Sequence, residues 1–358
     1  MKKVFLLIIF VLIFSCKEEN KPINKNEANP KLDNTEKQEF TDVVNLSNFP
    51  NTEFVASLEH PISENKNIVY ASTMPYAWDN IKNALGNLEI DKNATDLILL
   101  NNTKTHLNSL NKDEIDLEVK IEDTYIFSRA YFKKTLPFVE KLLRYQKPLK
   151  FKGEKVENFG FHDWMFSYNT NFNDIFNILY YKSNDDFIFN LLSKDKQHEI
   201  IIYKNKNFNK SNLKAIIDEA FKKIEIGNKE KTNKKNNKDY YFDFENDSVR
   251  IPVYNFNIET NFTKLENKNF KSKNKSYKTE VIYQRNALIL DEFGAIIESE
   301  AVDSAAAIID EIPKETPKQK LFILDSDFII IAKRKDSKNP YFVVLNRNDE
   351  LMTKFKKK

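Results

Sequence analysis

The order of apolar and polar residues divides the chain into three parts. An unbroken apolar run, 4–14, follows two lysines near the start. After it come mostly Lys, Asn, Glu and Pro, with few large apolar residues before Phe40. Such a stretch buries too little apolar surface to offset the entropy lost on ordering, so we expect a flexible tether at 16–51. Regular apolar patterns then begin, and they predict a folded domain at 52–358.

Within this domain the pattern predicts helices first and strands later. Pro75 suits a helix start, apolar residues recur after it at helical spacing, and Gly86 follows the last of them. Strict alternation at 115–121 predicts a half-buried strand. The other predicted helices are 94–107, 132–145 and 212–224, and the other strands are 68–70, 187–192, 200–203, 249–258, 281–290, 328–333 and 341–345. We therefore predict one α+β domain, with helices mainly in the N-terminal half and a large mixed or antiparallel sheet from the C-terminal half.

Composition excludes several classes of protein. The 358 residues include five glycines and one cysteine, so a collagen-like chain, a disulfide scaffold and a Cys-rich zinc module are ruled out. The formal charge is +3, and it falls to +1 if the first fifteen residues, which hold Lys2 and Lys3, are removed. A nearly neutral chain is a poor match for phosphate, so we expect no nucleic-acid partner.

Catalytic and metal-binding motifs are missing from the sequence. None of the four histidines forms an H-E-x-x-H pair, and there is no G-x-S-x-G elbow, P-loop or G-x-G-x-x-G. His162–Asp163 and His198–Glu199 are neighbours in sequence, but adjacent residues of a strand face opposite ways. We therefore expect no enzyme, no catalytic residue, no metal site and no cofactor.

The start of the chain resembles a bacterial lipoprotein signal. Eleven apolar residues make a helix of roughly 16 Å, about half a bilayer core, which suits a signal peptide at 1–15. Ser15 precedes the sole cysteine, as in a lipobox, although Phe14 departs from the usual residue. The resemblance implies that Cys16 carries a diacylglycerol and an N-linked acyl chain such as palmitate, enough for stable anchoring. A plain secretory signal, or a buried cysteine, is the alternative.

The residues after the cysteine bear on location. Lys17–Glu18–Glu19 resembles the lipoprotein export signal of the Bacteroidota, and the residue after the cysteine is not the Asp of inner-membrane retention. The resemblance implies a lipid-anchored protein of the outer membrane. Whether it faces the periplasm or the cell surface is left open.

The C-terminal third resembles the serpin family. The segments 249–270 and 276–292 resemble the serpin passage from a strand and polar turn to a long central strand, which ends here at Asp291–Glu292–Phe293–Gly294. A polar, alanine-rich stretch with two prolines follows at 295–320, and two apolar strands close the chain. The family's N-x-x-x-F-K-x-x-W strand is not found between 151 and 205. This resemblance implies a single serpin-like domain with an exposed reactive loop.

In serpins the cleaved loop inserts into the main sheet as a new strand. The resemblance places the hinge of that loop at Glu292, Gly294, Ala295, Ile297, Ser299 and Ala301. It places the bait region among Ala306, Ala307, Ile308, Lys314, Lys318 and Lys320. The alternate residues from Ala295 to Ala301 would then face the core, leaving Ile296, Glu298, Glu300 and Val302 outward. The implied partner is a serine or cysteine protease.

Two functions remain open at this stage. The first is inhibition of a protease by a membrane-anchored, monomeric serpin-like protein. The second is a non-inhibitory envelope lipoprotein that binds a protein partner, because the two glutamates and the pair of isoleucines depart from the run of small residues in inhibitory hinges. A generic α+β lipoprotein with a chance strand–loop–strand ending is the alternative to the resemblance itself.

Overall fold

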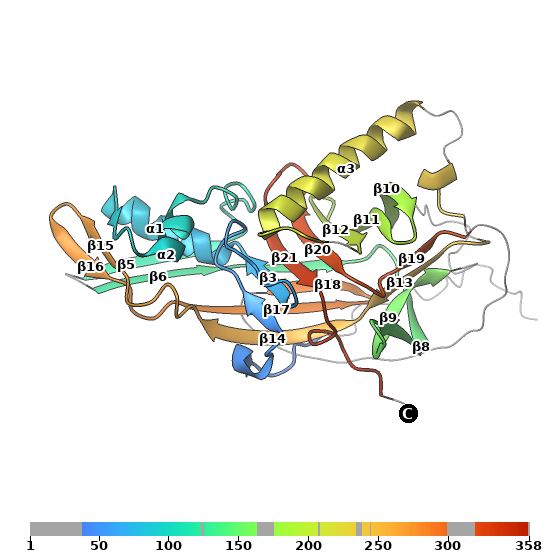
Figure 1. Cartoon of the computed structure of the whole chain (residues 1–358), viewed down its shortest axis with the longest axis horizontal. Coiled ribbons are helices and arrows are strands. Elements are labelled where there is room, and N and C mark those ends of the chain that lie inside the picture. The colour runs from blue at the N-terminus through green and yellow to red at the C-terminus, as the bar shows by residue number, and fades with distance from the viewer. Residues whose placement is uncertain are drawn as a thin grey trace, which may run out of the picture. The chain divides into compact units, whose positions relative to one another are not determined.

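The structure is a computed structural model that describes residues 38–122, 125–162, 175–206, 208–233, 238–243, 245–298 and 319–356 (Figure 1). All of them belong to one unit, 34–358. The helices are α1 (Thr73–Leu85), α2 (Thr95–Asn102) and α3 (Leu213–Asn233), with short 3-10 helices η1 (Leu46–Asn48) and η3 (Lys238–Tyr240). Within the described residues, no helix is long and apolar enough to cross a membrane.

Two large sheets dominate the domain. The five-stranded sheet has the order β1 (Val44–Asn45), β14 (Tyr254–Asn261), β17 (Tyr283–Asp291), β18 (Gly294–Glu298) and β7 (Lys133–Pro137). The seven-stranded sheet has the order β10 (Phe176–Ser183), β11 (Asp186–Leu192), β12 (His198–Asn205), β20 (Phe328–Arg334), β21 (Pro340–Asn346), β3 (Asn67–Ala71) and β2 (Thr52–Phe54).

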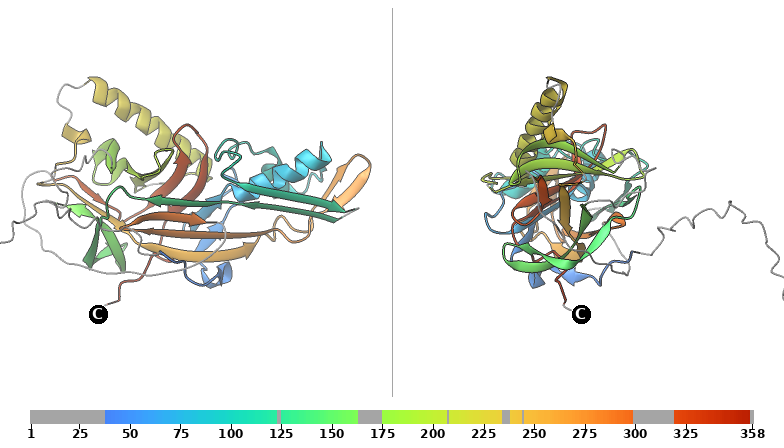
Figure 2. Two further views of the ribbon diagram at one scale, coloured as in Figure 1. Left: turned by 180° about the vertical axis from the view of Figure 1, so that it is seen from behind. Right: turned by 90° about the vertical axis from the view of Figure 1, so that its right-hand side faces the viewer.

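Three smaller sheets complete the strand pairing. The four-stranded sheet has the order β19 (Leu321–Ile323), β13 (Ser248–Pro252), β9 (Glu154–His162) and β8 (Leu143–Phe151). The three-stranded sheet joins β16 (Lys275–Lys278), β15 (Asn269–Ser272) and β4 (Glu89–Ile90). Finally, β5 (Asp116–Glu122) and β6 (Tyr125–Tyr131) form a hairpin beside α1, visible in the left view of Figure 2.

The main core lies between the two large sheets. Leu288 and Leu290 of β17 belong to the same buried cluster as Ile330 of β20 and Val344 of β21. The other face of the seven-stranded sheet packs against α3, which buries apolar residues such as Ile216. Sheet, sheet and helix thus form three layers, and the predicted single α+β domain is confirmed.

The structure corrects the prediction for 132–145. This segment is not a helix but the strand β7 and the start of β8. Phe132, Leu136 and Phe138 are buried while Lys133 and Thr135 between them are exposed, so the pattern has the two-residue period of a strand. Pro137, which lacks an amide hydrogen, would have interrupted a helix there. The second predicted helix is also shorter than expected and ends at Asn102.

The folded domain begins earlier than predicted. Phe40 was assigned to the tether, but it is buried against Ile289 and Ile296 on the outer face of the five-stranded sheet. β1 then pairs in parallel with β14. Leu46 and Phe49 also pack against the main core, so these residues, Phe40 and the pairing of β1 together dock residues 38–51 on the sheet.

Candidate functional site

A tight turn joins β17 to β18, where the sequence predicted the base of the loop. Gly294 has a φ of +146° there, and a Cβ atom at this position would lie 2.4 Å from the backbone oxygen of Leu136. The Phe138 amide donates a hydrogen bond of 2.9 Å to the Phe293 oxygen. Only glycine permits so close an approach, so the turn rests directly on the end of β7.

Two carboxylates beside this turn are buried. Glu292 is fully buried, and its Oε2 accepts a hydrogen bond of 2.7 Å from Arg144 Nε. Arg144 Nη1 also donates to Glu157 Oε2 over 2.6 Å, so this guanidinium links the turn to β8 and β9. Burial, and then the charge of Glu292, raises the pKa of Asp291 to about 6. The base of the loop is thus anchored to the four-stranded sheet.

The residues after the turn lie within the five-stranded sheet rather than in a projecting arm. β18 pairs antiparallel with β17 on one side and with β7 on the other. Ala295 and Ile297 point into the main core. Ile296, expected to face outward, lies on the opposite face but is buried, because Phe40 covers it.

Glu298 also lies on the outer face without reaching solvent. Its side chain is 1% exposed and forms an ion pair with Lys133, which lies opposite on β7. A carboxylate at this position of β18 is therefore matched by a cation on the neighbouring strand.

A cavity continues the line of β18. It has a volume of about 610 Å³, and one wall is β6 while the other is the segment 278–285, which leads into β17. Side chains of α1, among them Met74 and Trp78, also line it. We call this cavity the cleft. β6 is hydrogen-bonded to β5 on its other side, so the edge of β6 that faces the cleft has no strand partner within the described residues.

Polar groups lie on the core side of the two strands at the cleft. Gln284 Nε2 donates to Thr73 Oγ1 over 2.7 Å, and Ser128 Oγ donates to the Ala77 oxygen over 2.7 Å. Asn286 is fully buried, and its Oδ1 has no hydrogen-bond partner within the described residues. An unsatisfied buried acceptor carries a desolvation cost of about 1–3 kcal/mol. The Oδ1 atom of Asn286, just beyond the end of β18, is such an acceptor and could take a hydrogen bond from an added strand.

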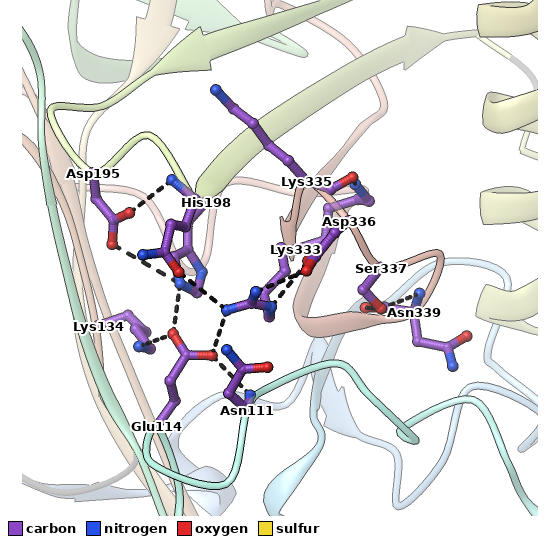
Figure 3. Close-up of polar contacts among 12 residues, drawn as sticks. Asn111, Glu114, Lys134, Asp195, His198, Lys333, Lys335, Asp336, Ser337 and Asn339 are labelled. Atoms are coloured by element: carbon purple, nitrogen blue, oxygen red, sulfur yellow. Dashed lines mark hydrogen bonds and ion pairs between the residues drawn. The ribbon is translucent and has the colours of Figure 1, made fainter.

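A cluster of charged side chains surrounds Glu114 and includes Lys134 of β7, a strand of the five-stranded sheet (Figure 3). Glu114 Oε1 accepts from His198 Nε2 over 2.7 Å and from Lys134 Nζ, and Glu114 Oε2 accepts from Arg334 Nη1 over 2.9 Å. Lys134 lies on β7, directly opposite Ile297 of β18. The cluster therefore joins β7, β12 and β20 to the segment that leads into β5.

Burial and neighbouring charges act in opposite directions on the pKa values of Glu114 and His198. Burial tends to raise the pKa of Glu114, but hydrogen bonds from Lys134 and the Asn111 amide, with the charge of His198, lower it to about 2. Burial lowers the pKa of His198, against the opposing effect of Glu114. Glu114 thus stays ionised over the physiological range and holds its donors. No three His, Cys, Asp or Glu side chains of the described residues are placed to hold a metal ion.

The structure places only part of the predicted site. Glu292, Gly294, Ala295 and Ile297 lie together at the turn and in β18. The predicted anchor and most of the loop lie outside the described residues, namely Cys16, Ser299, Ala301, Ala306, Ala307, Ile308, Lys314 and Lys318.

Lys320 is the one predicted bait residue that is described, and its position does not suit a bait. Its amide donates to Asp247 Oδ1 over 2.7 Å, and its Nζ lies 2.8 Å from Asp247 Oδ2. Asp247 is buried beside β13. A residue held by both its backbone and its side chain is poorly available to a protease, so Lys320 marks the far root of the loop at β19.

Sequence reasoning missed the partners that hold the site. Arg144 is 148 positions from Glu292, and Glu114 is 220 positions from Arg334. Charged residues at such separations carry no local pattern that would indicate a pair. The one available signal was the two-residue alternation around Leu136, which places Lys134 on the core side of β7.

Comparisons with known proteins give the following result. No protein-family model matches the sequence, and no curated protein matches it. Among solved structures, thyroxine-binding globulin in complex with thyroxine is 12% identical, with a TM-score of 0.42; 80% of this chain and 94% of that chain are covered.

Two serpin structures show similar values. Serpin-12 of Manduca sexta is 11% identical with a TM-score of 0.34, covering 64% of this chain and 57% of that one. The thermophilic serpin Tengpin in its native state is 12% identical with a TM-score of 0.33, covering 72% and 64%. These similarities are too low to transfer a function, so the proposals below rest on the geometry of this chain.

Proposed function

We propose that this chain is a lipid-anchored envelope protein whose serpin-like domain inhibits a protease by inserting its cleaved loop into the cleft. The observation that supports this most directly is β18, which starts the loop segment inside the sheet and ends at the cleft. The residues 299–318 connect β18, in the middle of one sheet, to β19 at the edge of another. Cleavage between these two roots would free the first part to extend β18.

The register of β18 defines what an extended strand would meet. Glu298 pairs with Ala287 of β17 and with Lys133 of β7. Continuing that register sets Ser299 opposite Asn286, whose Oδ1 is open to a hydroxyl donor. It sets Glu300 opposite Arg285, on the face where Glu298 already pairs with a cation. The two glutamates that depart from a small-residue hinge are thus met by cations on the flanking strands.

The length of the cleft limits where the bait bond can lie. In the continued register, the seven residues of β6 are matched by 300–306. The whole edge is filled only if the chain is cut at or after Ala306. Within that range Ala306, Ala307 and Ile308 fit an elastase-like protease, and Lys314 and Lys318 fit a trypsin-like one.

A pair of variants tests the proposal on the full chain. Ala301→Arg places a charge on the core side of the inserted strand, and Val302→Arg places the same charge on the outer side. We expect a denaturant-resistant protease adduct with the natural chain and with Val302→Arg, and a loss of at least about tenfold with Ala301→Arg, since burying the charge costs more than about 1.4 kcal/mol. The proposal fails if no elastase-like or trypsin-like protease forms an adduct, and cleavage of the loop leaves the melting temperature unchanged.

A non-inhibitory binder is the second candidate, and one feature favours it. The alternation that sets Ala301 toward the core also sets Asp303 there, where a buried carboxylate is costly. Because β18 is already in place, the further gain from insertion is limited to the residues before Asp303. If a partner is captured without cleavage, and still binds after replacement of 299–318, this candidate is preferred.

The anchoring rests on the sequence alone. The apolar run, Ser15 and Cys16 support lipidation, and the residues after them support the outer membrane. We expect Cys16→Ser to abolish labelling with radioactive palmitate and to move the chain from the membrane fraction to the soluble fraction. Retention of label in the variant would refute the anchor.

A further inference from the structure

The hairpin β5–β6 exposes an apolar strip along β5, whose outer edge has no strand partner among the residues that the structure describes. Eleven large apolar side chains are exposed among the described residues, and five of them lie on these two short strands. Three alternate along β5, namely Leu117 (45% exposed), Val119 (38%) and Ile121 (40%). Such an edge offers unpaired backbone groups to another strand, as well as apolar side chains on one face.

α1 lies on the face of this strip but covers it only in part. Ser128 of β6 donates to the Ala77 oxygen of α1, so the side chains that share its face point toward the helix. Val119 lies opposite Ser128, and Leu117 and Ile121 share that face. They nevertheless remain exposed, because β5 is the outer strand, as the left view of Figure 2 shows.

The opposite face of β5 carries alternating charge. Glu118 and Lys120 lie next to each other on it and form an ion pair of 2.6 Å within the strand. Asp116 and Glu122 lie at its two ends. An antiparallel neighbour with the same sequence brings the two apolar faces to the same side only if odd-numbered residues lie opposite odd-numbered residues.

We propose that β5 pairs antiparallel with β5 of a second copy of this chain, with the two Val119 residues facing each other across a twofold axis. In this register all seven residues overlap, and Leu117 meets Ile121 of the partner strand. Glu118 meets the partner strand's Lys120, and by symmetry the pairing occurs twice. The like charges of Asp116 and Glu122 meet only at the exposed ends, where water and salt screen them.

The charge pattern selects this register over its neighbours. With two Lys120 residues facing each other, Glu118 would meet Glu122 twice. With two Leu117 residues facing each other, Asp116 would meet Glu118 twice. Only a register centred on Val119 pairs the whole strand and sets opposite charges at its middle. It makes one four-stranded sheet with an α1 on the same face of each half.

This dimer is independent of the proposed inhibition, and it replaces the monomer expected from the sequence. One strand pair is a small interface, so we expect a weak dimer that forms as concentration rises. Sedimentation velocity of the full chain in detergent measures it. Glu118→Lys alone and Lys120→Glu alone each set like charges across the axis, and each is expected to raise the dissociation constant at least about tenfold.

Association in a mixture of the two variants is the decisive measurement. The lysine introduced at position 118 of one variant then meets the glutamate introduced at position 120 of the other. The mixture is therefore expected to form mixed dimers with the affinity of the natural chain. The side chain of Glu118 is 42% exposed and that of Lys120 is 65% exposed, so neither substitution disturbs the core, and circular dichroism checks that the fold is retained. A chain that stays monomeric at its highest soluble concentration would overturn the proposal, as would single variants that associate like the natural chain.

Cysteine crosslinking adds a second measurement. Side chains directly opposite across an antiparallel pair have Cβ atoms about 4.5–5.5 Å apart, close to the range for a disulfide. We expect Val119→Cys to form an intermolecular disulfide under oxidation, whereas Val281→Cys, at a site that is 74% exposed, forms much less. Equal crosslinking from both positions, measured against the natural chain with its Cys16, would contradict the twofold axis at Val119.

Discussion

Removing the cation at the base of the loop is the sharpest test of how the site is held. Arg144 is 9% exposed, and its Nε donates to Glu292, which is fully buried. Arg144→Met keeps the length and apolar stem of the side chain but removes the charge. Glu292 is then left as a buried carboxylate without its cation, which typically costs about 3–5 kcal/mol of stability.

The double variant Arg144→Met, Glu292→Leu separates this cost from a loss of packing. It removes both charges and fills the same volume, and such replacements of buried pairs are often neutral or stabilising. Glu157 loses one partner, but its side chain is 33% exposed and can be hydrated instead. We therefore expect the double variant to lie within about 1 kcal/mol of the natural chain.

Urea denaturation gives the free energy of unfolding for each variant. Lys214→Met is the matched control, because its pair with Asp218 is about half exposed and is worth at most about 0.5 kcal/mol. If Arg144→Met costs no more than this control, or if the double variant is as unstable as the single one, Glu292 is not held as a buried charge and the reasoning is wrong.

Three further predictions concern the turn at the base of the loop and the loop residues that would be inserted. Gly294→Ala should cost about 1–3 kcal/mol more than Gly153→Ala, which has a φ of +101° but nothing near its Cβ position; equal costs would exclude the backbone clash. The pKa of Asp291 is raised to about 6, so the folded state favours its neutral form and the free energy of unfolding falls as pH rises from about 4 to 6. Asp291→Asn should remove about 3 kcal/mol of this fall. A variant with the same pH profile as the natural chain would refute the raised pKa. Asp303→Ala should enlarge the rise in melting temperature after loop cleavage by about 3 °C, because about 2 kcal/mol is divided by an unfolding entropy of about 2.1 cal/mol/K per residue over roughly 300 residues. Ser304→Ala should leave the rise unchanged, and equal rises for the two variants would argue against insertion beyond position 302.

The sequence predicted elements whose pattern is local. α1 runs from Thr73 to Leu85 and stops at Gly86, and the strand predicted at 281–290 is β17, Tyr283–Asp291. Each is specified by the spacing of its own apolar residues and by the residue that ends it. The helix predicted at 132–145 was wrong because closely spaced apolar residues fit a helix as well as a strand until their partners are known, and because Pro137 was interpreted as a helix start or kink although it argues against a helix.

What could not be predicted depends on partners far away in the sequence. Alternation at 115–121 identified a strand and its apolar face, but not that α1 leaves part of that face exposed. Phe40 looked like a stray aromatic in a tether until the outer face of β17 supplied its contacts. The same holds for Arg144, since a buried carboxylate defines its role and nothing near it in the sequence does.

The position of β18 follows from how the two walls of the cleft are held. On one side, Glu114 holds Lys134 of β7, and Ser128 ties β6 to α1. On the other side, β17 is paired with β14 from Tyr283 to Leu290. These are separate attachments, so the walls can differ in spacing along their length. β18 fills the part where β7 lies close to β17, and its last residue pairs with Lys133 at the point where the cleft opens. If the loop inserts as proposed, it extends β18 from Glu298 into the cleft, along the register that β17 and β7 already set.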